Sequence, residues 1–299
     1  MILNNQKIKW AARNYLATDL GPREPLGSKS ILELENKEKI YYYCSGSGPI
    51  IVLSASMGRS VSDFNELVHA LNTKNFKTIA VESRGIEIKN KESNLSDLTL
   101  NDLASDIEKV LLDAKIPSDE RISLIGHAFG NRVVRCFASM LPKKVNSLIL
   151  IAAGGRNKLP DGLAESLWFS MFTDTSIKEQ ARHLRVVFFA QNSIIPNHWY
   201  YGWNRFLGER QIQASRATDK SKWWDSGNRP ILLFQGSKDP IAPPEYASEI
   251  LKKNYRGSLM VIDLPEVSHA LLPEADEEIS SRTIEFLQKM KLGLLKTVC

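Results

Sequence analysis

A five-residue segment with glycine at both ends is the most informative stretch for chemistry. Gly126-His127-Ala128-Phe129-Gly130 follows the apolar run Ile122 to Ile125 and precedes a pattern typical of a helix. A sharp turn from strand to helix strains the backbone of its central residue, so the residues two positions either side must be small. Gly126 and Gly130 meet this requirement. The central residue is Ala128, whose methyl group cannot attack a substrate.

Two polar residues farther along the chain each follow a predicted strand. Asp239 comes after the apolar run Ile231 to Gln235, and His269 comes after Leu259 to Asp263. Taken singly, an aspartate on a turn or a lone histidine on a loop most often has no catalytic role. Their joint placement after two successive strands favours a shared site.

Together the three segments resemble those of the α/β-hydrolase superfamily, whose members carry a GxSxG nucleophile elbow, then an acid, then a histidine. The resemblance covers roughly Ile31 to Leu287. It implies that Asp239 is the acid, that His269 is the base, and that Ala128 stands at the position of the nucleophilic serine. It also implies a packing role for His127 within the elbow.

The resemblance extends to an oxyanion hole, which needs two backbone N–H groups directed at the developing negative charge. Phe129 would supply the first and Ser56 the second. The segment Ser54-Ala55 stands where many relatives carry His-Gly, so this loop is alternatively only a structural turn between a strand and a helix. A further segment, Val81-Glu82-Ser83-Arg84-Gly85, is similar to the family's Asp-x-Arg-Gly.

Short β-rich runs alternate with amphipathic stretches, which predicts an α/β fold with a mostly parallel central sheet flanked by helices. The opening pair of strands should form an antiparallel hairpin. The predicted strands are Ile31 to Leu34, Ile40 to Cys44, Ile50 to Ser54, Lys77 to Val81, Ile122 to Ile125, Ser147 to Ile151, Ile231 to Gln235 and Leu259 to Asp263. Apolar residues at helical spacing predict helices near 64–71, 100–111 and 279–290.

The alternation stops between residues 156 and 226, where helical patterns dominate. We therefore expect an N-terminal extension over residues 1–28, a hydrolase core over 29–155 and 227–299, and an inserted helical cap over 156–226. The cap holds nearly half of the aromatic residues of the chain. These rings either build a core for the cap itself or line an apolar substrate pocket, and both uses are compatible.

Composition excludes several classes of protein. The net charge is +5, but the lysines and arginines are scattered among acidic residues, so no nucleic-acid partner is expected. No apolar run is long enough for a membrane span or a secretory signal, and a cytoplasmic location is the expectation. Three widely spaced cysteines give no disulfide framework, and the histidines show no metal-ligand spacing. Without GxGxxG or a P-loop no nucleotide cofactor is expected. The expected partner is a small-molecule substrate, and the oligomeric state is not indicated.

Ala128 leaves three explanations open. The alanine is an engineered replacement of serine, or a native residue in an enzyme whose His-Asp pair acts as a general base on water or on an acidic substrate proton, or a mark of a non-catalytic binder. Covalent acyl-enzyme turnover is excluded for this sequence in each case. The departure at Ser54-Ala55, remote in sequence from Ala128, favours a natural variant. The reaction implied by the resemblance is hydrolysis of an ester- or amide-like bond in a small, mostly apolar molecule.

Overall fold

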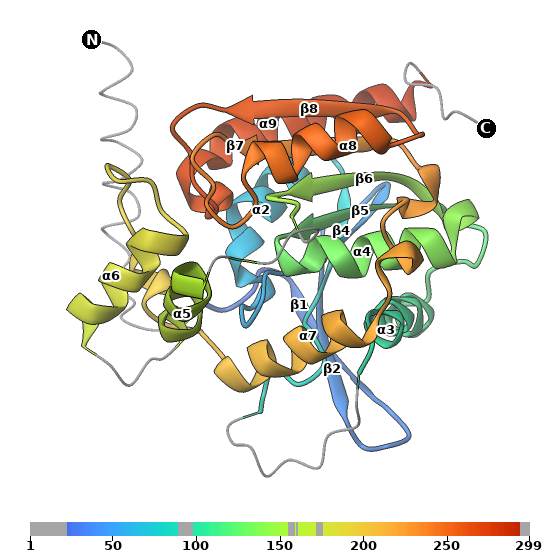
Figure 1. Cartoon of the computed structure of the whole chain (residues 1–299). Coiled ribbons are helices and arrows are strands. Elements are labelled where there is room, and N and C mark those ends of the chain that lie inside the picture. Colours follow the sequence, from blue (N-terminus) through green and yellow to red (C-terminus); the bar gives the residue numbers. More distant parts are fainter. Residues whose placement is uncertain (1–22, 89–97, 155–158, 160, 172–175, 294–299) are drawn as a thin grey trace.

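The computed structural model describes residues 23–88, 98–154, 159, 161–171 and 176–293. Eight strands form one sheet in the order β1-β2-β4-β3-β5-β6-β7-β8 (Figure 1). Their bounds are β1 Ser28–Glu33, β2 Lys39–Ser45, β3 Ile50–Ser54, β4 Lys77–Val81, β5 Ile122–His127, β6 Val145–Ile151, β7 Ile231–Gly236 and β8 Leu259–Leu264. All eight predicted strands are present, with ends shifted by a few residues.

The sheet is parallel except at one edge. β1 and β2 pair antiparallel as the predicted hairpin, and β2 also pairs antiparallel with β4. Every other pairing, from β4 through β8, is parallel. The structure therefore confirms the predicted fold class. β1 begins at Ser28, one residue before the boundary expected at residue 29, and most of the expected N-terminal extension lies outside the described residues.

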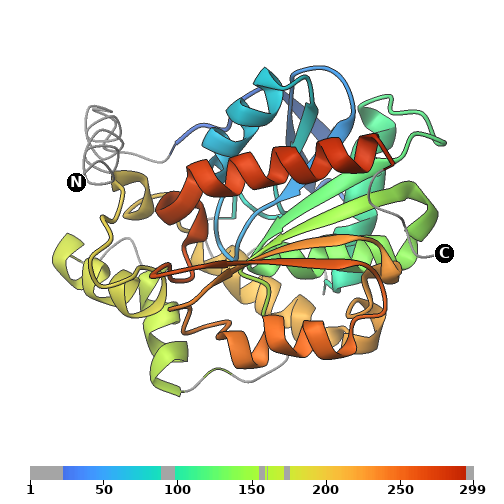
Figure 2. The same cartoon turned by 90° about the horizontal axis from the view of Figure 1, so that it is seen from above.

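Helices cover both faces of the sheet. α2 and α9 lie on one face, and α3, α4 and α8 lie on the other (Figure 2). The helices are α2 Asn65–Thr73, α3 Leu100–Asp113, α4 Phe129–Met140, α5 Asp161–Ser170, α6 Ile177–Val187, α7 Arg205–Ala217, α8 Ser248–Asn254 and α9 Leu271–Lys291. Short 3-10 turns are η1 Val61–Phe64, η2 Pro142–Lys144, η3 Asn197–Trp199, η4 Lys220–Lys222, η5 Ser226–Asn228 and η6 Pro244–Tyr246. The sequence patterns did not predict α8, and α9 begins at Leu271, earlier than the helix expected near 279–290.

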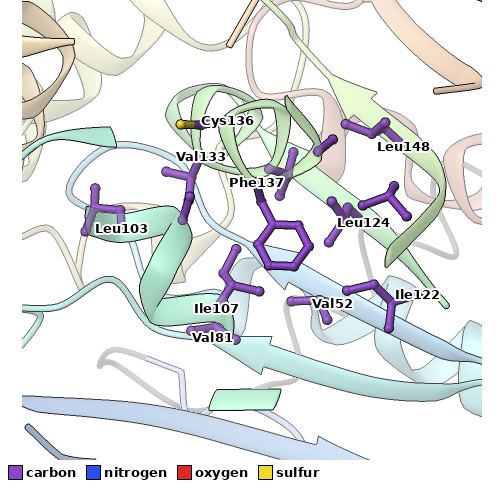
Figure 3. Close-up of a cluster of buried hydrophobic side chains, with 14 of the residues drawn as sticks. Val52, Val81, Leu103, Ile107, Ile122, Leu124, Val133, Cys136, Phe137 and Leu148 are labelled. Carbon is purple, nitrogen blue, oxygen red and sulfur yellow. The ribbon is translucent and has the colours of Figure 1, made fainter. Parts of the chain in front are cut away.

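Alternating strand residues supply the two halves of the core. On the face covered by α3 and α4, the ring of Phe137 lies among Val52, Leu124 and Ile107 (Figure 3). On the other face, strand neighbours such as Leu53 and Ile125 pack under α2 and α9. Burial of these side chains contributes roughly 25 cal/mol for each Å² of apolar surface removed from water. Both faces are apolar because both are covered, which explains the continuous apolar runs in the sequence.

Between β6 and β7, the regular elements in the described residues of the cap segment, 156–226, are all helices or 3-10 turns. α5 and α6 lie beyond the carboxyl ends of the parallel strands, and α7 runs back beneath the sheet (Figure 1). None of the helices within the described residues is both long enough and apolar enough to span a lipid bilayer.

Two backbones meet at an unusually short distance where β3 ends and α4 begins. A Cβ added at Gly130 would lie 2.0 Å from the carbonyl oxygen of Ser54 and 2.7 Å from that of Ala55. Neither oxygen belongs to a flexible side chain, so the main chain would have to shift. Gly130 therefore allows the start of α4 to lie against the loop that follows β3.

Gly130→Ala should destabilise the fold by about 3 kcal/mol or more, because the added methyl group overlaps main-chain atoms. Gly162→Ala in α5 is the matched control, since a Cβ there meets nothing within 4 Å. The control should gain roughly 0.5 to 1 kcal/mol from reduced freedom of the unfolded chain. Urea unfolding measures both changes. A Gly130→Ala midpoint equal to that of the parent chain would contradict the close approach.

A buried carboxyl group ties the loop after β3 to the end of β4. Glu82 accepts hydrogen bonds from the Ser60 hydroxyl and from the Val61 amide, and it is 4% exposed. Burial raises the pKa of Glu82 to about 7, and these two hydrogen bonds only partly oppose the rise. The folded protein therefore holds this proton to a higher pH than the unfolded chain does.

Glu82 should make the protein less stable as pH rises from about 4.5 to about 7. In that range the unfolded chain has lost the proton and the folded protein retains it, so deprotonation favours unfolding. The loss is on the order of 1.4 kcal/mol for each pH unit. Glu82→Gln should flatten this part of the stability profile, whereas Glu277→Gln on the exposed face of α9 should not. Equal slopes for the parent chain and Glu82→Gln, measured by urea unfolding between pH 4.5 and 7.5, would refute the assignment.

Candidate active site

The turn between β5 and α4 is strained at the residue that the sequence singled out. Ala128 has φ 48° and ψ −106°, an unfavourable region for a residue with a side chain. Its amide donates to the carbonyl of Ile151 at 3.0 Å. The Asn131 side chain donates to the same carbonyl at 2.7 Å, so β6 braces the turn from one side. Gly126 stands two residues before Ala128, and a Cβ at this position would lie 2.7 Å from Cα of Asn131.

His269 and Asp239 are brought together from loops 30 residues apart in the chain. Nδ1 of His269 lies 2.8 Å from Oδ2 of Asp239, and the two residues are 3% and 2% exposed. The second oxygen of Asp239 accepts from the amides of Ile241 and Ala242 at 2.9 and 2.8 Å. These two bonds fix the carboxylate, which can then receive the Nδ1–H of the imidazole. That tautomer leaves the Nε2 lone pair of His269 as a base.

The loop that carries His269 is held from both sides. Nε2 of His127 lies 3.3 Å from the carbonyl oxygen of His269, within reach for donation, and the two rings are 6.0 Å apart. Burial lowers the pKa of His127 to about 4, so its ring is neutral near pH 7. On the other side Glu274 accepts from the amides of Ser268 and Ala190, which joins the loop to the cap segment. His127 thus places the histidine loop beside the turn that carries Ala128.

The two predicted oxyanion donors lie at the start of α4 and in the loop after β3. Phe129 is the first residue of α4, where amides have no partner within the helix and the helix dipole favours negative charge. Ser56 is buried, and its carbonyl accepts from the Arg59 amide at 3.2 Å. Because Gly130 lies against Ser54, the two segments are in contact. We call residues 54–60, which include the predicted donor Ser56, the oxyanion loop.

Two groups of aromatic residues in the cap segment are packed against other parts of the chain. One group packs with Ala270 of the histidine loop in a single buried cluster, and Phe188 brings its ring centroid 5.7 Å from that of His269. Its rings are Phe188, Phe189, Trp199 and Trp203. The other group, Trp223 and Trp224, stacks on Arg135 of α4. The first group therefore builds a core for the cap segment that borders the histidine, whereas Trp223 belongs to the main core under α4. Trp203 and Phe206 also line a cleft. Phe172 lies outside the described residues.

A cleft of about 740 Å³ lies beside the oxyanion loop. Ser60, Glu82 and Trp203 line it, together with charged side chains such as Lys29 and Glu87. Among the residues that the structure describes, no group of three or more His, Cys, Asp or Glu side chains could hold a metal ion. Of the described residues, His269, Asp239 and Ala128 are not among those that line this cleft.

Several residues that shape this site were missed in the sequence. Asn131 braces the turn, Glu274 joins the histidine loop to the cap segment, and Arg59 is buried within the oxyanion loop. Each is a polar residue within five positions of a residue that the sequence had singled out. Local patterns gave no sign that their partners would come from distant parts of the chain.

Several other proteins are similar in sequence to part of this chain. A component of a Pseudomonas putida acetoin cleaving system, described as a dihydrolipoyllysine-residue acetyltransferase, is 26% identical over 56% of this chain and 45% of its own length. The chain thus spans less than half of that relative. A pimeloyl-[acyl-carrier protein] methyl ester esterase of Neisseria meningitidis is 27% identical over 56% of this chain and 68% of its own.

Solved structures show the same arrangement of strands and helices. A hydrolase from Pseudomonas aeruginosa superposes with a TM-score of 0.70 at 19% identity, and the match covers 87% of this chain and 98% of the other. At that identity the likeness bears on the fold alone. The sequence model of the family described as "alpha/beta hydrolase fold" matches residues 30–185, just over half of the sequence. The strained turn after β5, the strand order and this match together show that the chain belongs to the α/β-hydrolase fold family.

Proposed function

We propose that this protein hydrolyses an ester- or amide-like bond of a small, mostly apolar molecule, and that the His269–Asp239 pair activates water directly. The observation that carries the proposal is the buried 2.8 Å contact between the two side chains, with the second carboxylate oxygen held by two amides. The resemblance to an esterase from Neisseria meningitidis supports the same class of bond. No cofactor is required for this chemistry.

In the proposed reaction, Nε2 of His269 removes a proton from water as the water oxygen bonds to the carbonyl carbon. Asp239 stabilises the imidazolium that forms. The carbonyl oxygen becomes an oxyanion, which the Phe129 and Ser56 amides would receive. When the bond to the leaving group breaks, Nε2 returns its proton to that group. Ala128 forms no bond at any stage, because its side chain is a methyl group.

A serine at position 128 should convert the site to covalent catalysis. Ala128→Ser adds one oxygen, which the proposal places within reach of His269, in a turn whose backbone is already strained and whose flanking residues are glycine. Labelling by a fluorophosphonate probe should appear, and the rate of p-nitrophenyl acetate hydrolysis should rise by about 10² or more. The control is Ala128→Ser combined with His269→Ala, which should abolish both signals. A folded Ala128→Ser protein that takes up no probe would mean that the oxyanion loop is not arranged for acyl transfer.

The unchanged chain should lose its own hydrolytic activity when the dyad is broken. Against a panel of short-chain esters and amides, His269→Ala should lower kcat/KM by about 10² to 10⁴, since the general base is removed. Asp239→Asn should lower it by a similar factor, because an amide in place of the carboxylate favours the other imidazole tautomer. His69→Ala on the exposed face of α2 serves as the control and should have no effect. Small-molecule binding by the parent chain with no turnover that depends on His269 would instead identify a binder.

A further inference from the structure

Arg59 is a charged residue of the oxyanion loop that is buried against the cap segment, with 3% of its surface exposed. Its Nε donates to Oδ2 of Asp63 at 2.9 Å, and Nη2 donates to the other oxygen of the same carboxylate. Nη1 donates to the carbonyl of Tyr201 at 2.7 Å. Burial alone would raise the pKa of Asp63, but the guanidinium holds it below its ordinary value. Both charges are therefore present in the folded protein.

Two tryptophans of the cap segment cover the guanidinium. The Cζ atom of Arg59 lies 4.7 Å from the ring centroid of Trp199 and 4.6 Å from that of Trp203. Trp203 packs in turn on Phe188 at 5.2 Å, and Phe188 packs on His269 at 5.7 Å. A continuous row of side chains thus connects Arg59 to the proposed base. A planar guanidinium suits this position because it can stack on a ring and donate in a fork at once, which lysine cannot do.

The backbone of the oxyanion loop is also held by the cap segment. The Gly58 amide donates to the Gln211 side chain at 2.8 Å, and the Gly58 carbonyl accepts from the Asn204 amide at 2.9 Å. Asn204 donates through its side chain to the carbonyls of Ile86 and Ile88 as well. The cap segment therefore holds the backbone of the loop two residues after Ser56.

We propose that Arg59 is a positioning residue that locks the cap segment onto the oxyanion loop and so orients the Ser56 amide toward the reacting carbonyl. This inference rests on the proposed function, because it assigns Ser56 a role in that reaction. Arg59 itself does not touch the substrate. Its effect should fall on stabilisation of the transition state and much less on substrate affinity, since an oxyanion donor acts on charge that develops during the reaction.

The test removes the ion pair without leaving a buried charge. Arg59→Met alone would strand the Asp63 carboxylate, so the decisive variant is Arg59→Met combined with Asp63→Leu, because replacing both charges by apolar groups often preserves a fold. The matched control is Arg135→Met. Arg135 is also buried against two tryptophans, Trp223 and Trp224, but its partners are Ser226 and the Trp224 carbonyl.

The kinetic measurement is made in the Ala128→Ser background with p-nitrophenyl acetate and a fluorophosphonate probe. The double variant should lower kcat and the labelling rate by about 10- to 100-fold, with KM changed by less than about threefold. Arg59→Lys should recover little of the loss, and Arg135→Met should retain kcat. A double variant with the kcat of the control, or one changed only in KM, would overturn the proposal.

A second measurement does not depend on activity. Amide hydrogen exchange in the unchanged Ala128 background should become at least about tenfold faster at residues 56–60 and 198–204 in the double variant, and should be unaltered there in Arg135→Met. Unaltered exchange in the double variant overturns the proposed role of Arg59. Faster exchange with an unchanged kcat in the serine background overturns it too. An inactive serine background would mean that the oxyanion loop is not arranged for acyl transfer, which overturns the orientation of the Ser56 amide by Arg59. The exchange result then decides only whether Arg59 locks the cap segment onto the loop.

Discussion

The arrangement of the site depends on how closely two backbones approach at the elbow. The start of α4 lies directly against the end of β3, and only the missing side chain of Gly130 makes this possible. The same turn holds Ala128 at positive φ, braced by the Ile151 carbonyl of β6. The ends of β3, β5 and β6 therefore meet at this turn. The amide of Phe129 and the oxyanion loop come together there. Strain of this kind costs on the order of 1 to 3 kcal/mol, and the packed sheet around it supplies the compensation.

Beyond the carboxyl ends of these strands the molecule buries several charged groups. Each of these charges is compensated by a specific partner. Arg59 is paired with Asp63, and Asp239 accepts from two amides as well as from His269. A buried charge without a partner would cost several kcal/mol, so these contacts fix how the cap segment and the core meet. Apolar contacts alone would tolerate small displacements, whereas a forked hydrogen bond does not. The precision of the site thus comes from polar contacts, and its stability comes from the apolar core beneath.

The sequence predicted the parts of the structure that local patterns determine. Apolar runs located every strand, and glycine spacing located the strained turn at Ala128, because strand burial and turn geometry leave traces in neighbouring residues. Joint placement also brought Asp239 and His269 to one edge of the sheet. By contrast, the contacts of Arg59 with Trp199 and Trp203, or of Glu274 with Ala190, join residues more than 80 positions apart. Nothing near these residues in the sequence specifies such partners, and so they became visible only in the fold.

The balance of contacts at the dyad separates what stability requires from what it does not. Asp239 has a structural use, since losing it would leave the Ile241 and Ala242 amides without an acceptor. The His269 ring satisfies the other oxygen of that carboxylate, and within the described part of the chain its one hydrogen bond is to Asp239. An apolar residue at position 269 would leave this buried oxygen without a donor, which would be costly. Stability therefore explains why a donor stands opposite Asp239, but a hydroxyl or amide group could donate equally well. General-base catalysis needs a donor with a second, basic nitrogen, and this requirement favours an active dyad over an inert remnant, even with a methyl group at position 128.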